Sequence, residues 1–227
     1  MQMEREQVGC SVLRGLSLER GNAADYAALE RFHYRGGRPR GVLRLFRARC
    51  DGTLAGVIVE TVPPLNCAAR EVVLRGRYAG MDQRARAVAL NREVRTIARV
   101  IVHPLFRGVG VGGMLVSHVL AQAQTPFVEA FAAMGRIHPL FERAGMKRVE
   151  ELPGRDALRL LAALQAVGMR PVELVDAEAR ALPRELRAAL RAFARNKQAG
   201  VLGWVEEARR KLLSRPVYYF WRSPEVK

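Results

Sequence analysis

The sequence predicts an α/β (α+β) domain followed by a C-terminal helical extension. Three features indicate this: a hairpin around Asp51-Gly52, a β-branched strand at 96–102 that leads through a glycine-rich turn into a helix, and helical periodicity past Pro153-Gly154. We therefore expect residues 1–152 to form the α/β domain and residues 153–227 to form a helical extension that packs on it.

Apolar residues at helical spacing predict the helices, and alternating residues on either side of a tight turn predict the hairpin. The expected elements of the first domain are a helix at 16–32, strands at 42–50 and 54–62, a helix at 82–91, a strand at 96–102, a helix at 111–123, a strand at 126–130, a helix at 138–144 and a strand at 146–151. Three apolar helical stripes follow. The aromatic end at 217–221 is expected to pack back as a strand or plug.

The composition is that of an ordinary globular chain. Hydrophobic residues make up 49% and charged residues 26%, which is enough to build a core. No run approaches about 18 apolar residues and the N-terminus carries no apolar segment, so we expect neither a membrane span nor a secretory signal. The three cysteines lack C-x-x-C spacing, which argues against a disulfide framework or a metal site and favours a cytoplasmic location.

The charge is unusual, because 38 lysines and arginines face 22 acids and give a net charge of +16. Such a surface favours polyanions: nucleic acid, the ribosome or an acidic partner. Solubility combined with the codon usage of a GC-rich genome is the alternative explanation. The arginines expected to contact nucleic acid are Arg35, Arg38, Arg40, Arg184, Arg187 and Arg191. The oligomeric state, monomer or homodimer, is left open.

The segment at 101–113 is the most informative about chemistry, because a strand ends there, a glycine-rich turn follows and a helix begins. Glycines let the backbone turn several N–H groups to one side, and the helix N-terminus adds about half a positive charge. Together with Arg107, this predicts a cradle for a pyrophosphate. No Gly-Lys-Ser/Thr follows, so the turn is not a P-loop, and the glycine spacing does not give a dinucleotide-binding turn.

The stretch Arg107-Gly-Val-Gly110-Val-Gly112 resembles the acetyl-CoA-binding motif of the GNAT acyltransferases, in which a strand is followed by R/Q-x-x-G-x-G/A and a helix. The later stretch PLFERAGMK, at 139–147, resembles the LYEKxGF helix and turn of that family. The resemblance covers roughly residues 36–150. It implies the GNAT fold, a mixed central sheet with two splayed parallel strands flanked by helices. It also implies an N-acyltransferase that uses acetyl-CoA or a related acyl-CoA.

The resemblance further implies where the acyl donor binds. The pantetheine arm would lie between strands 97–102 and 127–130, and the N–H groups of 109–113 would hold the pyrophosphate. The residues implied to bind the acyl-CoA are Val100, Val102, Arg107, Gly108, Val109, Gly110, Val111, Gly112 and Gly113.

Three positions depart from the family pattern. Phe141 stands at the position of the usual tyrosine acid, Met134 at that of the usual asparagine, and Thr96 at the common position for a base. Either the proton is handled by an unusual set of groups, or the chain is a binder without activity.

Four residues are the candidates for catalysis: His33, Tyr34, Arg99 and Glu129. His33-Tyr34 precedes the hairpin, near the acceptor side that the resemblance implies, where polar aromatics among arginines suit stacking on a base. A helix end with Tyr34 packed on the core is the alternative. Arg99 lies beside the implied cofactor gap, where a buried arginine needs a partner; a solvated face is the alternative. Glu129 lies in an apolar run and suits a general base, with a salt bridge to Arg99 or Arg136 as the alternative.

Two further groups are weaker candidates, Glu93 as a base acting through water and His138 as a substitute acid. His103 and His118 are interpreted as structural.

Three functions stay open. The first is an acyltransferase acting on an exocyclic amine of a nucleic-acid base, in DNA or RNA. The pair His33-Tyr34, Arg99 and the basic surface are similar in style to the Mom DNA-modification proteins, a phage GNAT-like group that decorates adenine in DNA. This similarity implies a nucleic-acid partner that is DNA more than RNA. The second is an ordinary N-acyltransferase acting on a protein, a peptide or a small amine. The third is a nucleic-acid-binding module that kept the fold without activity.

Overall fold

The computed structural model of the chain describes residues 15–34, 36–149, 155–175, 182–213 and 216–224. The chain divides into two compact units, one of Met1–Val149 with Tyr218–Lys227 and the other of Glu150–Val217. We call the first the sheet unit and the second the helical unit. Within the described residues, no helix is long and apolar enough to cross a membrane.

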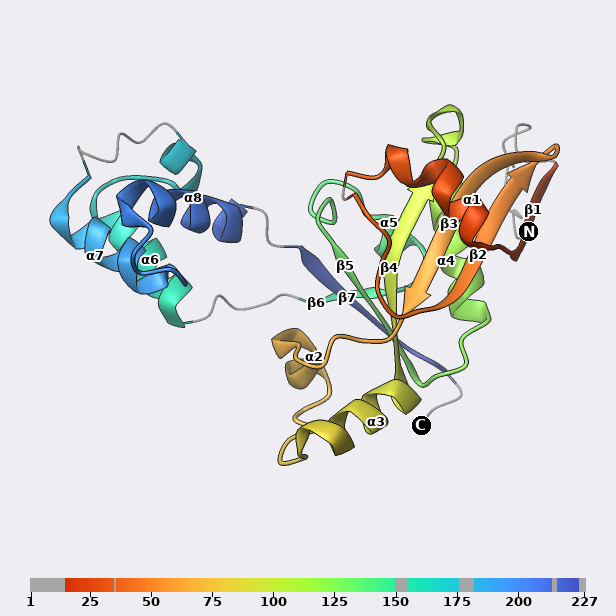
Figure 1. Cartoon of the computed structure of the whole chain (residues 1–227), viewed down its shortest axis with the longest axis horizontal. Coiled ribbons are helices and arrows are strands. Elements are labelled where there is room, and N and C mark those ends of the chain that lie inside the picture. The colour runs from red at the N-terminus through yellow and green to blue at the C-terminus, as the bar shows by residue number, and fades with distance from the viewer. Residues whose placement is uncertain (1–14, 35, 150–154, 176–181, 214–215, 225–227) are drawn as a thin grey trace, which may run out of the picture. The chain divides into compact units, whose positions relative to one another are not determined.

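In the described part of the chain, seven strands form one sheet in the order β1-β2-β3-β4-β5-β7-β6 (Figure 1). The strands β1 to β4 pair antiparallel, β4 pairs parallel with β5, and β6 pairs antiparallel with β7. The strands are β1 Leu16–Arg20, β2 Val42–Cys50, β3 Thr53–Thr61, β4 Val94–Val102, β5 Phe127–Ala132, β6 Lys147–Val149 and β7 Val217–Arg222. The predicted fold class, a mixed sheet flanked by helices, is confirmed.

The hairpin and the strand-turn-helix segment form where the sequence predicts them. Asp51 (φ 47°) and Gly52 (φ 79°) turn β2 into β3, and both residue types tolerate this left-handed conformation. The strand β4 leads through a short 3₁₀ turn, η3 Pro104–Phe106, into helix α4 Val111–Ala121.

The stretch 16–32, predicted as one helix, is split into different elements. Leu16–Arg20 form the edge strand β1 and pair with β2. Helix α1 Ala23–Leu29 begins only after Asn22, which closes a capping box, and the 3₁₀ turn η2 Glu30–Phe32 follows. The prediction was wrong over the first five residues because LSLER alternates apolar and polar residues, as a half-buried strand does.

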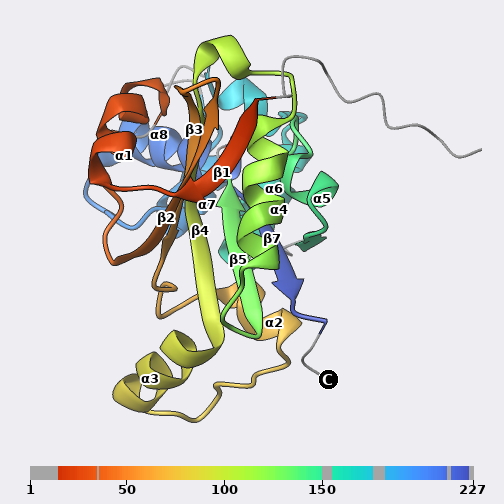
Figure 2. The same cartoon turned by 90° about the vertical axis from the view of Figure 1, so that its right-hand side faces the viewer.

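Helices cover both faces of the sheet. Gly56 of β3 faces α4, because a Cβ there would lie 3.0 Å from the Leu115 side chain. The neighbouring Val57 and Val59 face the other way and pack with Leu29 of α1. The alternation along β3 therefore places α1 and α4 on opposite faces, as Figure 2 shows.

The connection from β3 to β4 carries two more helices, α2 Ala68–Val73 and α3 Gln83–Glu93. Asp82 caps α3 by accepting a hydrogen bond from the N–H of Ala85. Leu90 of α3 is buried in one cluster with residues of the sheet, so this connection is anchored to the core.

The helical unit is inserted between two neighbouring strands rather than appended to the end. It follows β6, and the chain then returns as β7 between β5 and β6. The division after residue 149 lies close to the expected boundary, but the last strand, expected in the extension, belongs to the sheet unit. Tyr218, Tyr219 and Phe220 are buried in that strand, so the predicted return of the aromatic end is confirmed.

The helical unit has its own apolar core. Its elements are α6 Arg155–Ala166, the 3₁₀ turn η4 Pro171–Val175, α7 Arg184–Phe193 and α8 Gly200–Leu213. Leu160 and Leu164 of α6 pack with Leu186 and Leu190 of α7. The three apolar stripes in the sequence therefore mark the three helices of this core. That the unit packs on the sheet unit stays a prediction.

Candidate functional site

The parallel strands β4 and β5 pair only at their start. The pairing joins residues 94–97 to residues 127–130 and stops there, although β4 continues to Val102. On its other side, β4 has one extra residue at Ala98 in its register with β3. Such a bulge increases the local twist of a strand, and this one lies where the two strands part. The predicted splay of the two strands is confirmed.

The glycine-rich turn beyond the end of β4 leaves the space over its backbone open. Gly108 (φ 83°) and Gly110 (φ 100°) are left-handed, and Gly110 is the N-cap of α4. A Cβ at Gly108, Gly110 or Gly113 would meet no described atom within 4 Å, so the space over the turn is open. The first N–H groups of a helix have no intrahelical acceptor, and here they begin at Val111. The predicted cradle therefore has the donors and the dipole that bind a phosphate.

The other residues implied to bind acyl-CoA line the same region. Val100 lies on the part of β4 that has left β5, and Val109 lies in the turn between the two left-handed glycines. The side chain of Val111 is buried (1% exposed), so only its backbone is placed to contact a ligand.

The Arg107 side chain braces the turn, and the missing side chain of Gly112 lets two helices pack closely. Arg107 donates from Nε to the Val102 carbonyl (3.2 Å) and from Nη2 to the Phe32 carbonyl (3.3 Å), so it braces the turn against η2. Val102, whose backbone is implied to lie near the acyl-CoA, therefore also receives a hydrogen bond from Arg107 at its carbonyl. A Cβ on Gly112 would lie 3.1 Å from Leu140 Cδ1, so this position is needed for close packing of α4 on α5 Leu140–Arg143.

The structure brings His33 and Tyr34 close to the cradle. The ring of Phe32 packs edge-on against His103 (5.1 Å between centroids), just before η3, and its carbonyl accepts from Arg107. The rings of His33 and Tyr34 stack on each other at 4.6 Å, and Tyr34 is 64% exposed. Tyr34 is therefore not the core residue of the alternative interpretation but part of an exposed aromatic pair.

Arg99 lies on the splayed half of β4 and faces the same side of the sheet as α1. It pairs in register with Val59, whose side chain packs with Leu29. Its Nη1 donates to the Ala98 carbonyl (2.8 Å), whereas its buried Nε has no hydrogen-bond partner among the described residues. A buried donor without a partner is costly, so the hydrogen bonding of Arg99 is incomplete among the described residues.

Glu129 is closed off as a general base. Its Oε1 accepts from Arg70 Nη2 (2.7 Å) and Thr96 Oγ1 (2.8 Å), and its Oε2 accepts from Arg70 Nε and Tyr218 Oη, both at 2.8 Å. Arg70 and Glu129 are both fully buried. The structure therefore favours the salt-bridge interpretation, with Arg70 rather than Arg99 or Arg136 as the partner. Because its two oxygens already accept four hydrogen bonds, the carboxylate holds the structure together and is not available as a base.

The network has two members that sequence reasoning missed, Arg70 and Tyr218. They lie 59 and 89 residues from Glu129 along the chain, and no local pattern marks them. Burial and the neighbouring Glu129 carboxylate raise the pKa of Tyr218, which keeps its hydroxyl a neutral donor. A signal was present only in the sequence Val217-Tyr-Tyr-Phe-Trp, which was too aromatic to be exposed.

The position of the usual acid is occupied by a packed aromatic pair. Phe141 is 7% exposed and its ring lies 5.1 Å from that of Tyr219, while Met134 is exposed. The Tyr219 hydroxyl donates to the Gly135 carbonyl (3.1 Å). Burial, with the nearby Glu142 carboxylate, raises the pKa of Tyr219 to about 12. Tyr219 therefore carries a hydroxyl beside the position of the missing acid, but this residue is fully buried.

The remaining titratable residues considered for catalysis lie in different environments. Glu93 accepts from Arg77 and Tyr78, and the hydrogen bond from Arg77 holds its pKa below the ordinary value, so it is a poor base. His138 is exposed. His103 packs between aromatic rings and His118 packs on Phe46, which confirms their structural interpretation.

The arginines expected to contact nucleic acid occupy two places. Arg35 lies outside the described residues, and Arg38 and Arg40 are exposed after the aromatic pair. Arg184, Arg187 and Arg191 are exposed on α7, opposite its buried leucines. In the described residues, no group of three His, Cys, Asp or Glu side chains is arranged to hold a metal ion.

No family model and no curated protein matches the chain. Among solved structures, a GNAT family acetyltransferase from Elizabethkingia anophelis with acetyl-CoA bound is 13% identical, over 60% of this chain and 79% of that one (TM-score 0.41). The N-acetylglutamate synthase from Neisseria gonorrhoeae, with coenzyme A and N-acetyl-glutamate, is 14% identical over 92% of this chain and 35% of that one (TM-score 0.41). The ribosomal-protein-S18-alanine N-acetyltransferase from Escherichia coli is 13% identical over 60% and 79% (TM-score 0.39). Because these sequence identities and TM-scores are low, the function has to be argued from the residues of the site.

Replacing Gly110 tests the cradle. Gly110→Val places a β-branched residue at φ 100° and adds atoms to the open side of the turn, so the affinity for coenzyme A should fall at least tenfold. Isothermal titration calorimetry measures this. Gly168→Val, at φ 70° in the helical unit, introduces a comparable backbone strain and should leave the affinity unchanged. Equal affinities of the two variants would contradict a cradle at Gly110.

Replacing Glu129 tests the buried network. Glu129→Gln leaves the Arg70 charge unpaired and should lower the free energy of unfolding by about 3–5 kcal/mol. Tyr218→Phe removes one hydrogen bond to a charged group, and the expected loss is about 1.5–3 kcal/mol. Urea denaturation measures both. Asp156→Asn, in an exposed pair with Arg159, is the control and should change little. A Glu129→Gln variant as stable as this control would show that the network does not hold the fold.

Proposed function

We propose that this protein is an acyl-CoA-dependent N-acyltransferase of GNAT type whose acceptor is an exocyclic amine of a nucleic-acid base. The observation that carries the acyltransferase is the open glycine cradle at the head of α4, set directly beyond two parallel strands that part. The nucleic-acid acceptor is supported by the stacked pair of His33 and the exposed Tyr34, and by the exposed Arg38 and Arg40 that follow this pair in the chain.

The residues present fit acyl-CoA. Gly108, Gly110 and Gly113 leave room for a phosphate to approach the backbone, and the helix N-terminus offers N–H donors to it. The unpaired Nε of Arg99, in the parted region, suits a carbonyl oxygen. Bound acyl-CoA supplies the acyl group as an activated thioester.

The chain's own residues position the acceptor and receive its proton. The stacked rings of His33 and Tyr34 offer a surface on which a base can stack, and Arg38 and Arg40 lie close in sequence to contact its phosphates. An exocyclic amine inside a duplex cannot reach such a site, so the base has to be unpaired or flipped out. His33 is the group that accepts the proton of the attacking amine, since Glu129 is closed and Thr96 donates to it. Because Phe141 carries no hydroxyl, water protonates the leaving thiolate.

The remaining candidate is an N-acyltransferase acting on a protein or a small amine. It shares the cradle but does not require the exposed aromatic pair or the basic surface. Nucleoside mass spectrometry separates the two, because only the nucleic-acid acceptor yields an acylated base.

Incubation with acetyl-CoA and single-stranded or duplex DNA tests the reaction. His33→Ala should lower kcat at least a hundredfold and leave the affinity for coenzyme A unchanged, because a general base contributes about 10²–10⁴ in rate. Tyr34→Ala should raise the KM for nucleic acid, whereas Tyr34→Phe keeps the stacking ring and should behave as the original protein. Acylated nucleosides and free thiol are the measured products. Full activity of His33→Ala would remove His33 from the site without affecting the cradle.

The affinity for nucleic acid should fall steeply with salt, since it rests on contacts with phosphate. Reversing the charges of Arg184, Arg187 and Arg191 to Glu should lower the slope of log affinity against log salt by about three, one for each lost phosphate contact. The same three positions changed to Lys keep the charge and should keep the slope. Fluorescence anisotropy at several salt concentrations measures it, and a flat dependence in the original protein would favour the small-amine acceptor.

A further inference from the structure

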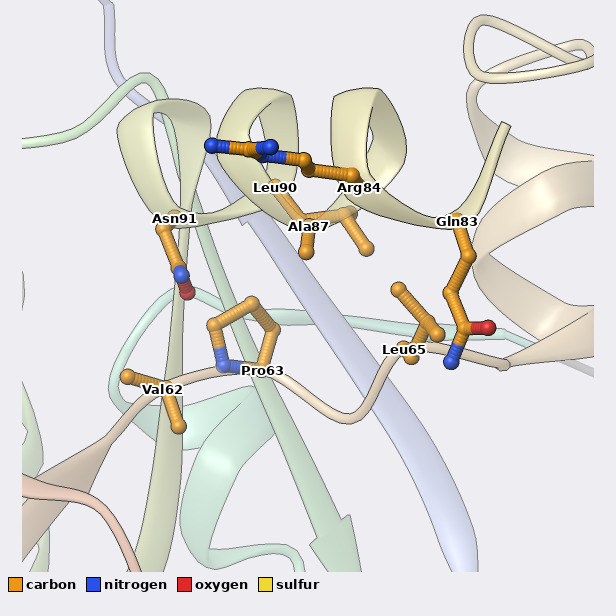
Figure 3. A pocket seen from close by; sticks show the side chains of 8 residues that line it. All are labelled: Val62, Pro63, Leu65, Gln83, Arg84, Ala87, Leu90 and Asn91. Carbon is orange, nitrogen blue, oxygen red and sulfur yellow. The ribbon is translucent and has the colours of Figure 1, made fainter. Parts of the chain in front are cut away.

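A cavity of about 420 Å³ lies away from the cradle, between α3 and the segment that leaves β3 (Figure 3). This volume is within the range of about 300–1,000 Å³ typical of small-molecule sites. The residues that line it are Val62, Pro63, Leu65, Gln83, Arg84, Ala87, Leu90 and Asn91. The motifs that define the cradle do not include any of them.

Both walls of the cavity are held in place. On one wall, the Pro64 carbonyl accepts from Arg70 Nη2 (2.9 Å), and Arg70 is itself fixed by Glu129. On the other wall, Leu90 is 1% exposed and anchors α3 in the core, while Asp82 caps the start of this helix. The cavity is therefore largely preformed, as ligand sites usually are.

Apolar side chains form the two walls of the cavity, and an amide side chain lies at each end. In Figure 3 the ring of Pro63 faces Ala87 and Leu90 across the gap, which gives two apolar surfaces. The Asn91 amide points toward Pro63 at one end, and the Gln83 amide lies beside Leu65 at the other. Neither amide makes a side-chain hydrogen bond within the described residues. A flat ligand that offers donors and acceptors at its edges would fill the gap and use both amides.

One cation lines the cavity. It is Arg84, which is exposed, and its side chain runs along α3 in Figure 3. A ligand that is flat, edge-polar and attached to a negatively charged group is the chemistry that this set recognises.

We propose that this cavity binds an unpaired nucleobase of the nucleic-acid strand, with Gln83 and Asn91 on the base edges and Arg84 on a neighbouring phosphate. Asparagine and glutamine amides form paired hydrogen bonds with base edges, and arginine binds phosphate. The proposal deepens the proposed function, on which its nucleic acid rests: a second base held away from the cradle would fix the strand while the first is modified. A fatty acid or an acidic peptide would use the apolar walls or the arginine, but not both amides.

Filling the cavity is the direct test. Ala87→Trp adds a large ring between the two apolar walls, and Val88→Trp, at the adjacent and 47% exposed position that does not line the cavity, is the matched control. A fluorescein-labelled single-stranded DNA 12-mer is the probe, together with the same strand carrying abasic sites. Ala87→Trp should weaken binding of the normal strand about tenfold, because the added ring takes the space of one base and a tenfold change in affinity corresponds to about 1.4 kcal/mol. It should leave binding of the abasic strand unchanged.

A second variant addresses the polar contacts without filling the space. Gln83→Ala combined with Asn91→Ala should weaken the normal strand and spare the abasic strand, and circular dichroism confirms that each variant is folded. Equal effects of Ala87→Trp and Val88→Trp, or no effect of either, would overturn the proposal. So would loss of laurate or poly-glutamate binding in Ala87→Trp with unchanged DNA binding.

The coenzyme A affinity of each variant separates this proposal from the proposed function. A chain that binds coenzyme A but no DNA at low salt would overturn the base-binding cavity and the nucleic-acid acceptor together, and would leave the acyltransferase. A chain that binds DNA through the cavity but no coenzyme A would overturn the acyltransferase alone.

Discussion

The buried ion pair between Arg70 and Glu129 is the interaction on which the rest of the sheet unit depends. Taking two charges out of water costs several kcal/mol per ion, and only good geometry with further hydrogen bonds offsets that cost. Glu129 meets this condition with donors from Arg70, Thr96 and Tyr218. These come from α2, β4 and β7, while Glu129 itself lies on β5. One carboxylate therefore joins four segments at the point where β4 and β5 part.

Arg70 also contacts the segment that forms one wall of the cavity beside α3. Its Nη2 donates both to Glu129 and to the Pro64 carbonyl, in the segment that forms one wall of that cavity. A buried ion pair contributes little net stability over a well-packed apolar replacement, but it fixes the geometry of its members. The value of the pair is therefore positional, because two apolar residues could fill the space but could not hold the Pro64 carbonyl. This explains why a charged residue lies in the apolar run of β5, which sequence reasoning read as a catalytic base.

The sequence predicted those features whose causes are local. The Asp51-Gly52 turn, the β-branched β4 and the glycine-rich turn each depend on neighbouring residues, and each forms at its predicted place. The errors arose where distant contacts decide. The strand β1 forms because β2 offers it an edge, and the side chain of Arg107 is drawn to the Phe32 carbonyl 75 residues away. The insertion of the helical unit was hidden for the same reason, since only the pairing of β7 shows that the chain returns to the sheet.

The net charge alone does not show which arginines are available to a ligand, because several of them form ion pairs with acids. Between Glu30 and Asp51 the sequence holds only basic charges, yet Arg44 pairs with Glu60 and Arg47 pairs with Glu19 and Asp25, so strand β2 is largely neutralised. Arg38 and Arg40 precede that strand and are exposed, with no ion pair among the described residues. On α7, Arg184 and Arg187 have no acidic partner in the described chain, and Arg191 lies over the Trp204 ring. A polyanion would therefore meet its available cations at two places, beside the aromatic pair and on α7, and each place lies in a different unit.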